Sequence, residues 1–165
     1  MIKLLNGAAA FLRRDGEILL MKRSPVRIIS PGVWSGIGGK LEQAELNDPR
    51  AACLREIEEE TGIPPAHVFD LKLRYVIVRL HRDTLRQTYI YFGRTDMDPT
   101  IATDEGELHW IPEEALLDRE YTQTFTQMLR HSVERPDARV IVGVAARENG
   151  ACRMHWTPVE DFEIH

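Results

Sequence analysis

The feature that most constrains the fold of this chain is a predicted helix with clear sequence signals at both its start and its end. Asp48 is a favoured N-cap residue, and Pro49 follows at the first helical position, where a missing N–H costs nothing. Residues 50–61 contain no glycine or proline, and Gly62 can end the helix in a left-handed conformation before the prolines at 64 and 65 prevent its continuation. The pattern predicts a helix over residues 50–61.

The end of this helix carries an unfavourable charge. Glutamates occupy positions 56, 58, 59 and 60, where the negative end of the helix dipole makes each anion cost a few tenths to ~1 kcal/mol. Glu56 shares a helix face with Glu59 and Glu60, and each such pair adds a repulsion of ~0.2–0.5 kcal/mol. Two interpretations remain open: a solvated acidic face, or a face that binds a cation. Oxygen ligands at this spacing suit Mg²⁺ or Mn²⁺, and the sequence has no Cys/His cluster for zinc.

A glycine-rich segment precedes the helix. Residues 24–39 hold two prolines and four glycines, so we expect them to be mostly loop. Gly36, Gly38 and Gly39 would let the backbone approach a ligand closely, and Lys40 follows them. The order of residues is not that of a P-loop, which requires a lysine followed by serine or threonine.

Together, the glycine turn and the acidic helix resemble the Nudix box, whose pattern is Gly, five residues, Glu, seven residues, then Arg-Glu-apolar-x-Glu-Glu-x-Gly-apolar. Gly39 and Glu45 match its first part, and residues 55–63 match its second part in full. One departure is that nine residues, 46–54, separate the two parts. The simplest interpretation is a two-residue insertion in the loop before the helix, which leaves the helical spacing unchanged. The resemblance is strongest over residues 7–117.

The resemblance implies a divalent metal site. Glu56, Glu59 and Glu60 would ligate Mg²⁺ or Mn²⁺, with the backbone carbonyl of Gly39 as a further ligand. A metal held there would neutralise a diphosphate and activate a water molecule for attack on phosphorus.

It also implies supporting roles for residues around the glutamates. Arg55 would orient Glu45 rather than touch the substrate, although an ordinary surface ion pair is the alternative. Lys40 would neutralise charge on the diphosphate or the leaving group, unless it is a solvated lysine, and Gly38 and Gly39 would border the bound substrate.

The general base is left open among several carboxylates. Members of the Nudix family differ in which carboxylate removes the proton from the water, and Glu56 and Glu59 lie in the box itself. Glu105 or Glu107, in the segment before Trp110, is an alternative, and the same segment can equally be read as a polar turn.

Residues that would recognise the rest of the substrate are less clearly marked. Arg23, Arg79 and Arg94 are candidates for phosphate contacts. The aromatic residues Trp34, Tyr89, Tyr91 and Trp110 are candidates for stacking on a base, although core or loop packing is the favoured interpretation for each of them.

The implied activity is hydrolysis of a nucleoside diphosphate linked to another moiety. Signatures of the coenzyme A, ADP-ribose and diadenosine polyphosphate subfamilies are incomplete, so elimination leaves a MutT-like (d)NTP pyrophosphohydrolase. The alternative is a non-catalytic Nudix-like module that binds a nucleotide or ADP-ribose. The intact box glutamates favour the enzyme.

Outside the helix, β-formers and turn pairs predict several strands. Asp15-Gly16 and Asn149-Gly150 are hairpin turns. Strands are expected at residues 8–13, 17–22, 71–80, 87–94, 108–111, 140–146 and 151–156, a short helix at 112–117 and a longer one at 121–134. This order indicates the α/β (α+β) class. The resemblance implies a single domain over residues 1–165, an α/β/α sandwich with a mixed β-sheet between helices.

The composition limits the kinds of molecule that this protein is expected to bind. A net charge of −5 argues against coating a nucleic acid polymer, and 43% hydrophobic residues argue against disorder. No apolar stretch is long enough for a membrane span. The two cysteines, about a hundred positions apart, indicate reduced thiols and a cytoplasmic location. We expect a small-molecule nucleotide ligand, no membrane partner, and a monomer or homodimer.

Overall fold

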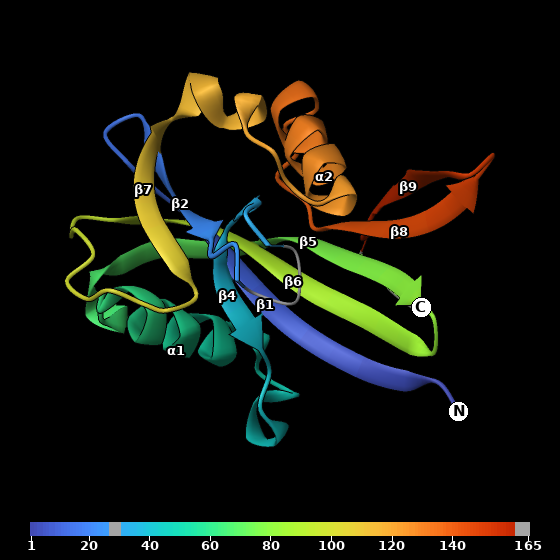
Figure 1. The fold of residues 1–165 in the computed structure, drawn as a ribbon, viewed down its shortest axis with the longest axis horizontal. Helices are drawn as coiled ribbons and strands as arrows, with labels where there is room; N and C mark the ends of the chain where they lie inside the picture. The colour runs from blue at the N-terminus through green and yellow to red at the C-terminus, as the bar shows by residue number, and fades with distance from the viewer. Residues whose placement is uncertain (27–30, 161–165) are drawn as a thin grey trace, which may run out of the picture.

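The computed structural model describes residues 1–26 and 31–160, which form a mixed β-sheet with helices on both faces (Figure 1). The strands are β1 (Lys3–Arg14), β2 (Glu17–Arg23), β3 (Trp34–Ser35), β4 (Ile37–Lys40), β5 (Val68–His81), β6 (Thr84–Thr95), β7 (Gly106–Pro112), β8 (Ile141–Glu148) and β9 (Ala151–Pro158). The helices are α1 (Pro49–Thr61) and α2 (Gln123–Glu134), with 3₁₀ turns η1 (Gln43–Glu45), η2 (Pro65–His67) and η3 (Glu113–Asp118).

Strand β1 pairs with three other strands, β2, β4 and β6. The strand order is β3-β2-β1-β6-β5-β8-β9, while β4 also pairs with β1 and β7 with β2. The β1–β6 and β5–β8 pairs are parallel and the others antiparallel, so the sheet is mixed. The expected fold class is therefore confirmed.

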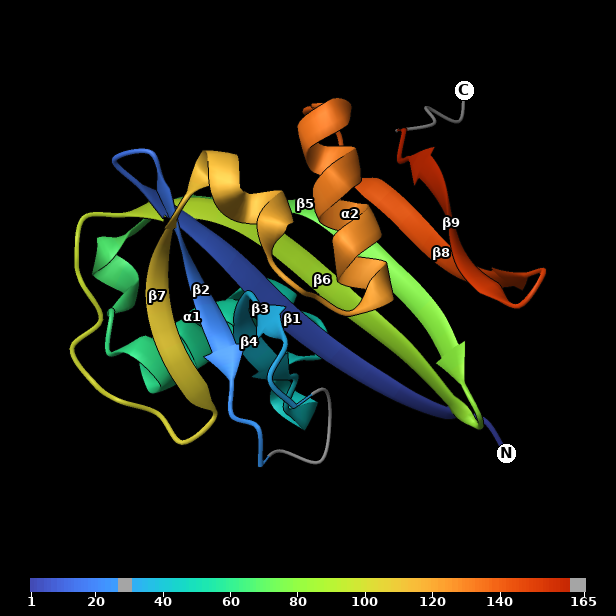
Figure 2. The ribbon, with the colours of Figure 1, turned by 45° about the horizontal axis from the view of Figure 1, so that its top comes forward.

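Alternation along β1 builds two hydrophobic cores. Ala9 and Phe11 belong to the core that includes Met128 and Leu129 of α2. The intervening residues Ala8, Ala10 and Leu12 belong to the core that includes Cys53 and Ile57 of α1. Successive side chains of a strand point to opposite faces, so α1 and α2 cover opposite sides of β1 (Figure 2).

Helix α1 forms where the sequence predicts it. The Asp48 carboxylate accepts a hydrogen bond of 3.1 Å from the Ala51 N–H, which caps the N-terminus. Gly62 adopts φ 75°, and its N–H donates to the Glu58 carbonyl at 2.8 Å. The ends of the acidic helix are thus fixed by local interactions.

The expectation that residues 24–39 are mostly loop is wrong for their second half, because β3 and β4 form there. Strand β4 pairs antiparallel with β1, and Gly38 lies opposite Ala9. A Cβ atom on Gly38 would collide with the Ala8 carbonyl oxygen. The glycines here permit a close approach between two strands, which overrides their low strand propensity.

Other expected elements are present with shifted bounds. The short helix predicted at residues 112–117 is the 3₁₀ turn η3, and the helix predicted from Tyr121 begins at Gln123. The last hairpin, β8–β9, joins the sheet through the parallel β5–β8 pair. Among the described residues, no helix has both the length and the apolar character that a membrane crossing demands.

Candidate functional site

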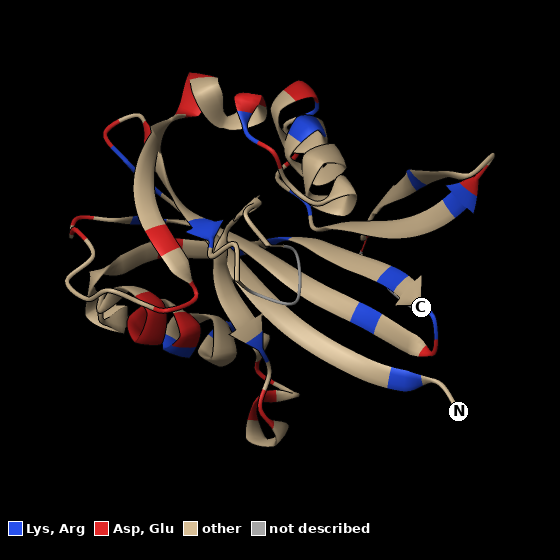
Figure 3. Ribbon diagram, viewed as in Figure 1, with Lys and Arg blue, Asp and Glu red and all other residues tan. Residues whose placement is uncertain are grey.

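A cleft of ≈ 530 Å³ runs from helix α1, past β4 and β1, to strands β5 and β6. Glutamates of α1 line one end of this cleft, and arginines of β5 and β6 line the other. Figure 3 shows the same separation: acidic residues are concentrated on α1, and basic residues lie on neighbouring stretches of β5 and β6.

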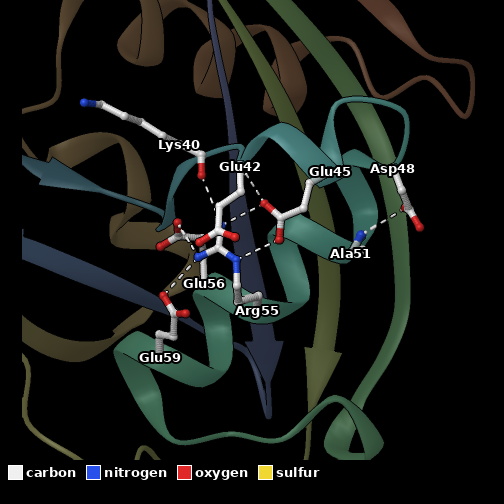
Figure 4. Close-up of polar contacts among 8 residues, drawn as sticks. All are labelled: Lys40, Glu42, Glu45, Asp48, Ala51, Arg55, Glu56 and Glu59. Atoms are coloured by element: carbon white, nitrogen blue, oxygen red, sulfur yellow. Dashed lines mark hydrogen bonds and ion pairs between the residues drawn. The ribbon is translucent and has the colours of Figure 1, made fainter.

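Arg55 binds three glutamates at the α1 end of the cleft (Figure 4). Its Nε and Nη2 atoms donate to the two carboxylate oxygens of Glu45 at 2.7 and 2.9 Å. Its Nη1 atom donates to Glu56 at 2.9 Å and Glu59 at 3.0 Å, and Nη2 also donates to the Lys40 carbonyl at 3.1 Å. The guanidinium group therefore connects η1, β4 and α1.

Glu45 reaches Arg55 despite the two-residue insertion that follows it. It ends η1, and its carboxylate also accepts a hydrogen bond of 2.8 Å from the Glu42 N–H. The hydrogen bond from Arg55, with a smaller contribution from Glu42, lowers the pKa of Glu45 to about 2. The contact between Arg55 and Glu45 that the sequence predicts is present, and the extra residues are accommodated between η1 and α1.

Two carboxylates of α1 face the cleft, of which Glu60 is buried and Glu56 is half-buried. Glu60 is 8% exposed, and it accepts one hydrogen bond of 3.1 Å from the Gly38 N–H. Burial raises its pKa to about 8, and the negative charge of Glu56 adds to the effect, while the Gly38 N–H opposes it. Burial also raises the pKa of Glu56, against the opposing influence of Arg55. Two neighbouring carboxylates are thus destabilised in their charged forms.

This donor set fits a hard divalent cation. Glu56, Glu60 and Gly39 line one end of the cleft, and a Cβ atom on Gly39 would collide with the Glu56 carboxylate. All the potential ligands are oxygen atoms, which Mg²⁺ and Mn²⁺ prefer. A cation at this position would offset the desolvation that raises both pKa values.

Glu59, the third predicted ligand, shares the Arg55 Nη1 donor with Glu56 but lies outside the cleft. It is not among the cleft-lining residues, its side chain is 56% exposed, and its carboxylate is bound to Arg55. In residues 1–26 and 31–160, no three His, Cys, Asp or Glu side chains are gathered closely enough to hold a metal ion as they stand. Glu59 would have to release Arg55 to join a metal site.

The remaining predicted residues are divided between the cleft and the surface. Lys40, Gly38 and Glu105 line the cleft. Glu105 is positioned by a backbone hydrogen bond of 3.0 Å from the Ser24 N–H to its carbonyl. Glu107 is 80% exposed in its side chain and lies 3.3 Å from His109. Of the four carboxylates considered as a general base, Glu56 and Glu105 therefore face the cleft.

The arginines expected to contact phosphate also differ in where they lie. Arg23 and Arg79 line the cleft, whereas Arg94 is exposed and paired with Asp70 at 2.6 Å. Arg86 and Asn6 line the cleft but were not expected from the sequence. For Arg86, strand alternation carries the signal, since it lies two and four residues before Thr88 and the buried Ile90.

The stacking candidates are mostly engaged in packing. Tyr91 is buried in the core beneath α1, and the Tyr89 hydroxyl accepts a hydrogen bond of 2.6 Å from Gln87. Trp110 is covered by Arg14 at 4.3 Å. Trp34 lines a smaller pocket of ≈ 170 Å³ that shares Arg23, Arg79 and Arg86 with the main cleft.

Comparisons with known proteins bear on the family and on the fold of this chain. The family model for the NUDIX domain matches residues 3–132. A CTP pyrophosphohydrolase of Escherichia coli is 42% identical over 62 residues, which cover 38% of this chain and 44% of that protein. The chain therefore matches less than half the length of this curated relative.

Solved structures extend the likeness to the fold. A MutT protein from Bacillus halodurans superimposes with a TM-score of 0.75 at 16% identity, covering 94% of this chain and 99% of that one. The NUDIX domain of Shewanella oneidensis NrtR, solved with ADP ribose, gives a TM-score of 0.62 at 20% identity, covering 83% and 90%. At these identities the superpositions describe the fold alone.

Proposed function

The chain belongs to the NUDIX family, and from this premise we propose that it is a divalent-metal-dependent pyrophosphohydrolase acting on a nucleoside diphosphate derivative. The observation that carries the proposal is the pair of carboxylates, buried Glu60 and half-buried Glu56, at one end of a cleft whose other lining residues include Lys40 and arginines. An anionic substrate and a cation would each compensate charges that the cleft leaves unbalanced.

Within this proposal, Glu56, Glu60 and the Gly39 carbonyl would hold Mg²⁺ or Mn²⁺, and Glu59 would be a further ligand only if its carboxylate left Arg55. The ion would supply charge neutralisation for the diphosphate and a lowered pKa for an attacking water. Arg55 and Glu45 are positioning residues, because they fix the orientation of Glu56 without lining the cleft.

Other residues of the chain then have two further roles, in neutralising substrate charge and in removing a proton from the attacking water. Lys40 places a positive charge at the end of β4, next to the glycines that border the substrate. A carboxylate facing the cleft removes the proton from the attacking water, and Glu105 and Glu56 are the candidates for this general base. Such a proton transfer contributes typically ~10²–10⁴-fold to rate.

For the substrate, we propose a (d)NTP that is cleaved to a nucleoside monophosphate and pyrophosphate. The similarity to a CTP pyrophosphohydrolase over 62 residues supports this class. The second candidate is a binding module for a nucleotide or ADP-ribose. The position of Glu59 favours that alternative, because only two of the three expected carboxylates, Glu56 and Glu60, line the cleft.

The test is product release over a panel of NTPs, oxidised dNTPs, nucleotide sugars, ADP-ribose, dinucleoside polyphosphates and coenzyme A, with Mg²⁺ or Mn²⁺. Glu56→Gln should lower kcat by about 100-fold or more, because it removes a charged group from the metal end. Glu58→Gln is the matched control, since Glu58 is exposed on the same helix.

Mn²⁺ binding, measured by electron paramagnetic resonance, gives an independent readout of the same pair of variants. Glu56→Gln should weaken Mn²⁺ binding and Glu58→Gln should not. Tight nucleotide binding by the wild type without turnover on any compound would instead support the binding module.

A further inference from the structure

The arginines at the far end of the cleft are not explained by metal binding or by water attack. Arg79 of β5 and Arg86 of β6 are directly opposite each other in the antiparallel register. Directly opposed residues have Cβ atoms ~4.5–5.5 Å apart, and like charges in such a pair are destabilising. A sheet selected only for stability would not place two arginines here.

Neither arginine has an acidic partner within residues 1–26 and 31–160. In the described part of the chain, no ion pair or side-chain hydrogen bond involves Arg79 or Arg86, and the Nε atom of Arg86 is buried without a hydrogen-bond partner. Burial lowers the pKa of Arg79, and the positive charge of Arg86 lowers it further. Both side chains line the cleft, where their charge would be compensated by an anion.

Arg23 extends this positive charge toward the glutamates. Its Nε atom is also buried and unpaired, and it lines both the main cleft and the smaller pocket beside Trp34. Its charge opposes the rise in the pKa of Glu60, so it also acts on the end of the cleft that Glu56 and Glu60 line. The cleft therefore has a cationic side that starts near Glu60 and ends at Arg79 and Arg86.

The strand register gives the separation between the two ends. Gly38 is opposite Ala9, and Arg86 is opposite Leu5, so the two positions differ by four residues, or ~13 Å, along β1. Arg86 is also two strands away from β4, or ~10 Å across the sheet. A single phosphoanhydride, with only two P–O bonds between its phosphorus atoms, is too short to span this separation.

We propose that Arg79 and Arg86 form an anion subsite for a phosphate group of the substrate that is not part of the attacked anhydride. This inference rests on the proposed function for the identity of the ligand, and it adds a requirement to it: the substrate carries negative charge at both ends of the cleft. Two kinds of phosphate satisfy the requirement, namely a more distant phosphate of a polyphosphate chain and a phosphate on a ribose hydroxyl.

Binding of inorganic triphosphate in the presence of EDTA tests the subsite without metal and without catalysis. Isothermal titration calorimetry should show binding to the wild type, at least about 10-fold weaker binding to Arg79→Gln and to Arg86→Gln, and a further loss in the double variant. Arg74→Gln is the matched control, because Arg74 lies on the same strand and also has an unpaired buried Nε, but does not line the cleft.

Thermal stability separates an anion subsite from a structural role. Without ligand, Arg86→Gln should raise Tm by about 1–4 °C, because it removes the repulsion from Arg79. Triphosphate should raise the Tm of the wild type and have a smaller effect on the variant. A lower Tm in the variant, with an unchanged response to triphosphate, would overturn the proposal.

Substrate pairs then identify the phosphate. One series compares adenosine di-, tri- and tetraphosphate, and the other compares NAD with NADP, which differ by one ribose phosphate. The subsite predicts that KM differs between the members of one series and that the ratio of their KM values moves toward one in Arg79→Gln/Arg86→Gln. Unchanged KM ratios in both series, for a wild type that turns over their members, would contradict the assignment.

The outcomes distinguish this inference from the proposed function. Arginine-dependent triphosphate binding without hydrolysis of any compound would leave the subsite standing and reject the pyrophosphohydrolase. Hydrolysis of a nucleotide, together with triphosphate binding that is the same in the wild type and in both arginine variants, would support the pyrophosphohydrolase and reject the subsite.

Discussion

At the scale of single residues, Arg55 is the group on which the acidic end of the cleft depends. Five polar contacts, shared among Glu45, Glu56, Glu59 and the Lys40 carbonyl, hold one guanidinium group in a fixed orientation. Bidentate contacts of this kind are stronger than ordinary surface ion pairs because both partners are charged and their geometry matches. The 14% and 25% exposure of the Glu45 and Arg55 side chains limits screening by water.

Acid titration of stability should reveal the Glu45–Arg55 contact. Because the folded-state pKa of Glu45 is about 2, below the usual 4.5, the contact stabilises the protein above pH 4.5, and this contribution is lost as the pH falls toward 2. Glu45→Gln should therefore be less stable than the wild type by about 1–3 kcal/mol at pH 6, and most of this difference should be gone near pH 2. Urea unfolding at several pH values measures this difference in the free energy of unfolding between the wild type and Glu45→Gln.

Glu58→Gln serves as the control for this titration, since Glu58 is an exposed glutamate of the neighbouring helix. A gap between wild type and Glu45→Gln that stays constant from pH 6 to pH 2 would show that the contact does not depend on the ionised carboxylate.

At the scale of elements, glycines decide how closely the parts of the site approach. Gly38 lets β4 lie against β1, and Gly39 leaves space for the Glu56 carboxylate. Gly62 ends α1 with a positive φ and is packed against Thr100. The hydrogen bond of 2.8 Å from the Thr100 N–H to the Thr61 carbonyl then joins the end of the helix to the segment after β6.

Two glycine variants separate backbone strain from packing. Gly16 and Gly62 have φ values of 82° and 75°, so alanine at either position should cost about 1–2 kcal/mol. Gly16 has open space around it, whereas a Cβ atom on Gly62 would collide with the Thr100 hydroxyl. Urea unfolding should therefore show a loss for Gly62→Ala that is larger than that for Gly16→Ala by about 1 kcal/mol. Equal losses would mean that Thr100 moves aside freely.

At the scale of the whole molecule, the C-terminal hairpin completes one of the two cores. The family model ends at residue 132, but β8 continues the sheet beside β5, and Met154 and Trp156 of β9 pack against the core under α2. Trp156 lies with its ring centroid 5.7 Å from that of Tyr75 and 4.7 Å from that of His131. Gly143 leaves room for the ring, because a Cβ atom there would collide with it.

Truncating Trp156 should thus destabilise the fold and not only the hairpin. We expect Trp156→Ala to lower the free energy of unfolding by about 2–4 kcal/mol, since it removes a large side chain that packs on helix α2 and on strands β5 and β8. His155→Ala, an exposed neighbour paired with Glu148, should cost less than about 1 kcal/mol. Calorimetry of both variants measures the difference, and similar losses would place Trp156 outside the cooperative core.

The sequence by itself determined the local features of this protein. The caps of α1, the Asp15-Gly16 and Asn149-Gly150 turns, and the family pattern at residues 55–63 depend on interactions between residues close in the chain, which sequence patterns record directly. The pairing of Arg55 with Glu45 was implied by the family resemblance, and it is present although the inserted residues lie between them.

Only the tertiary structure decided which residues share the cleft. Glycine spacing suggested a loop where β4 forms, because the space between β4 and β1 depends on residues thirty positions apart. Glu59 faces Arg55 instead of the cleft, and Arg86 meets Arg79 only through the β5–β6 register. Side-chain direction is set by strand pairing and helix packing, which bring together residues that no local pattern connects.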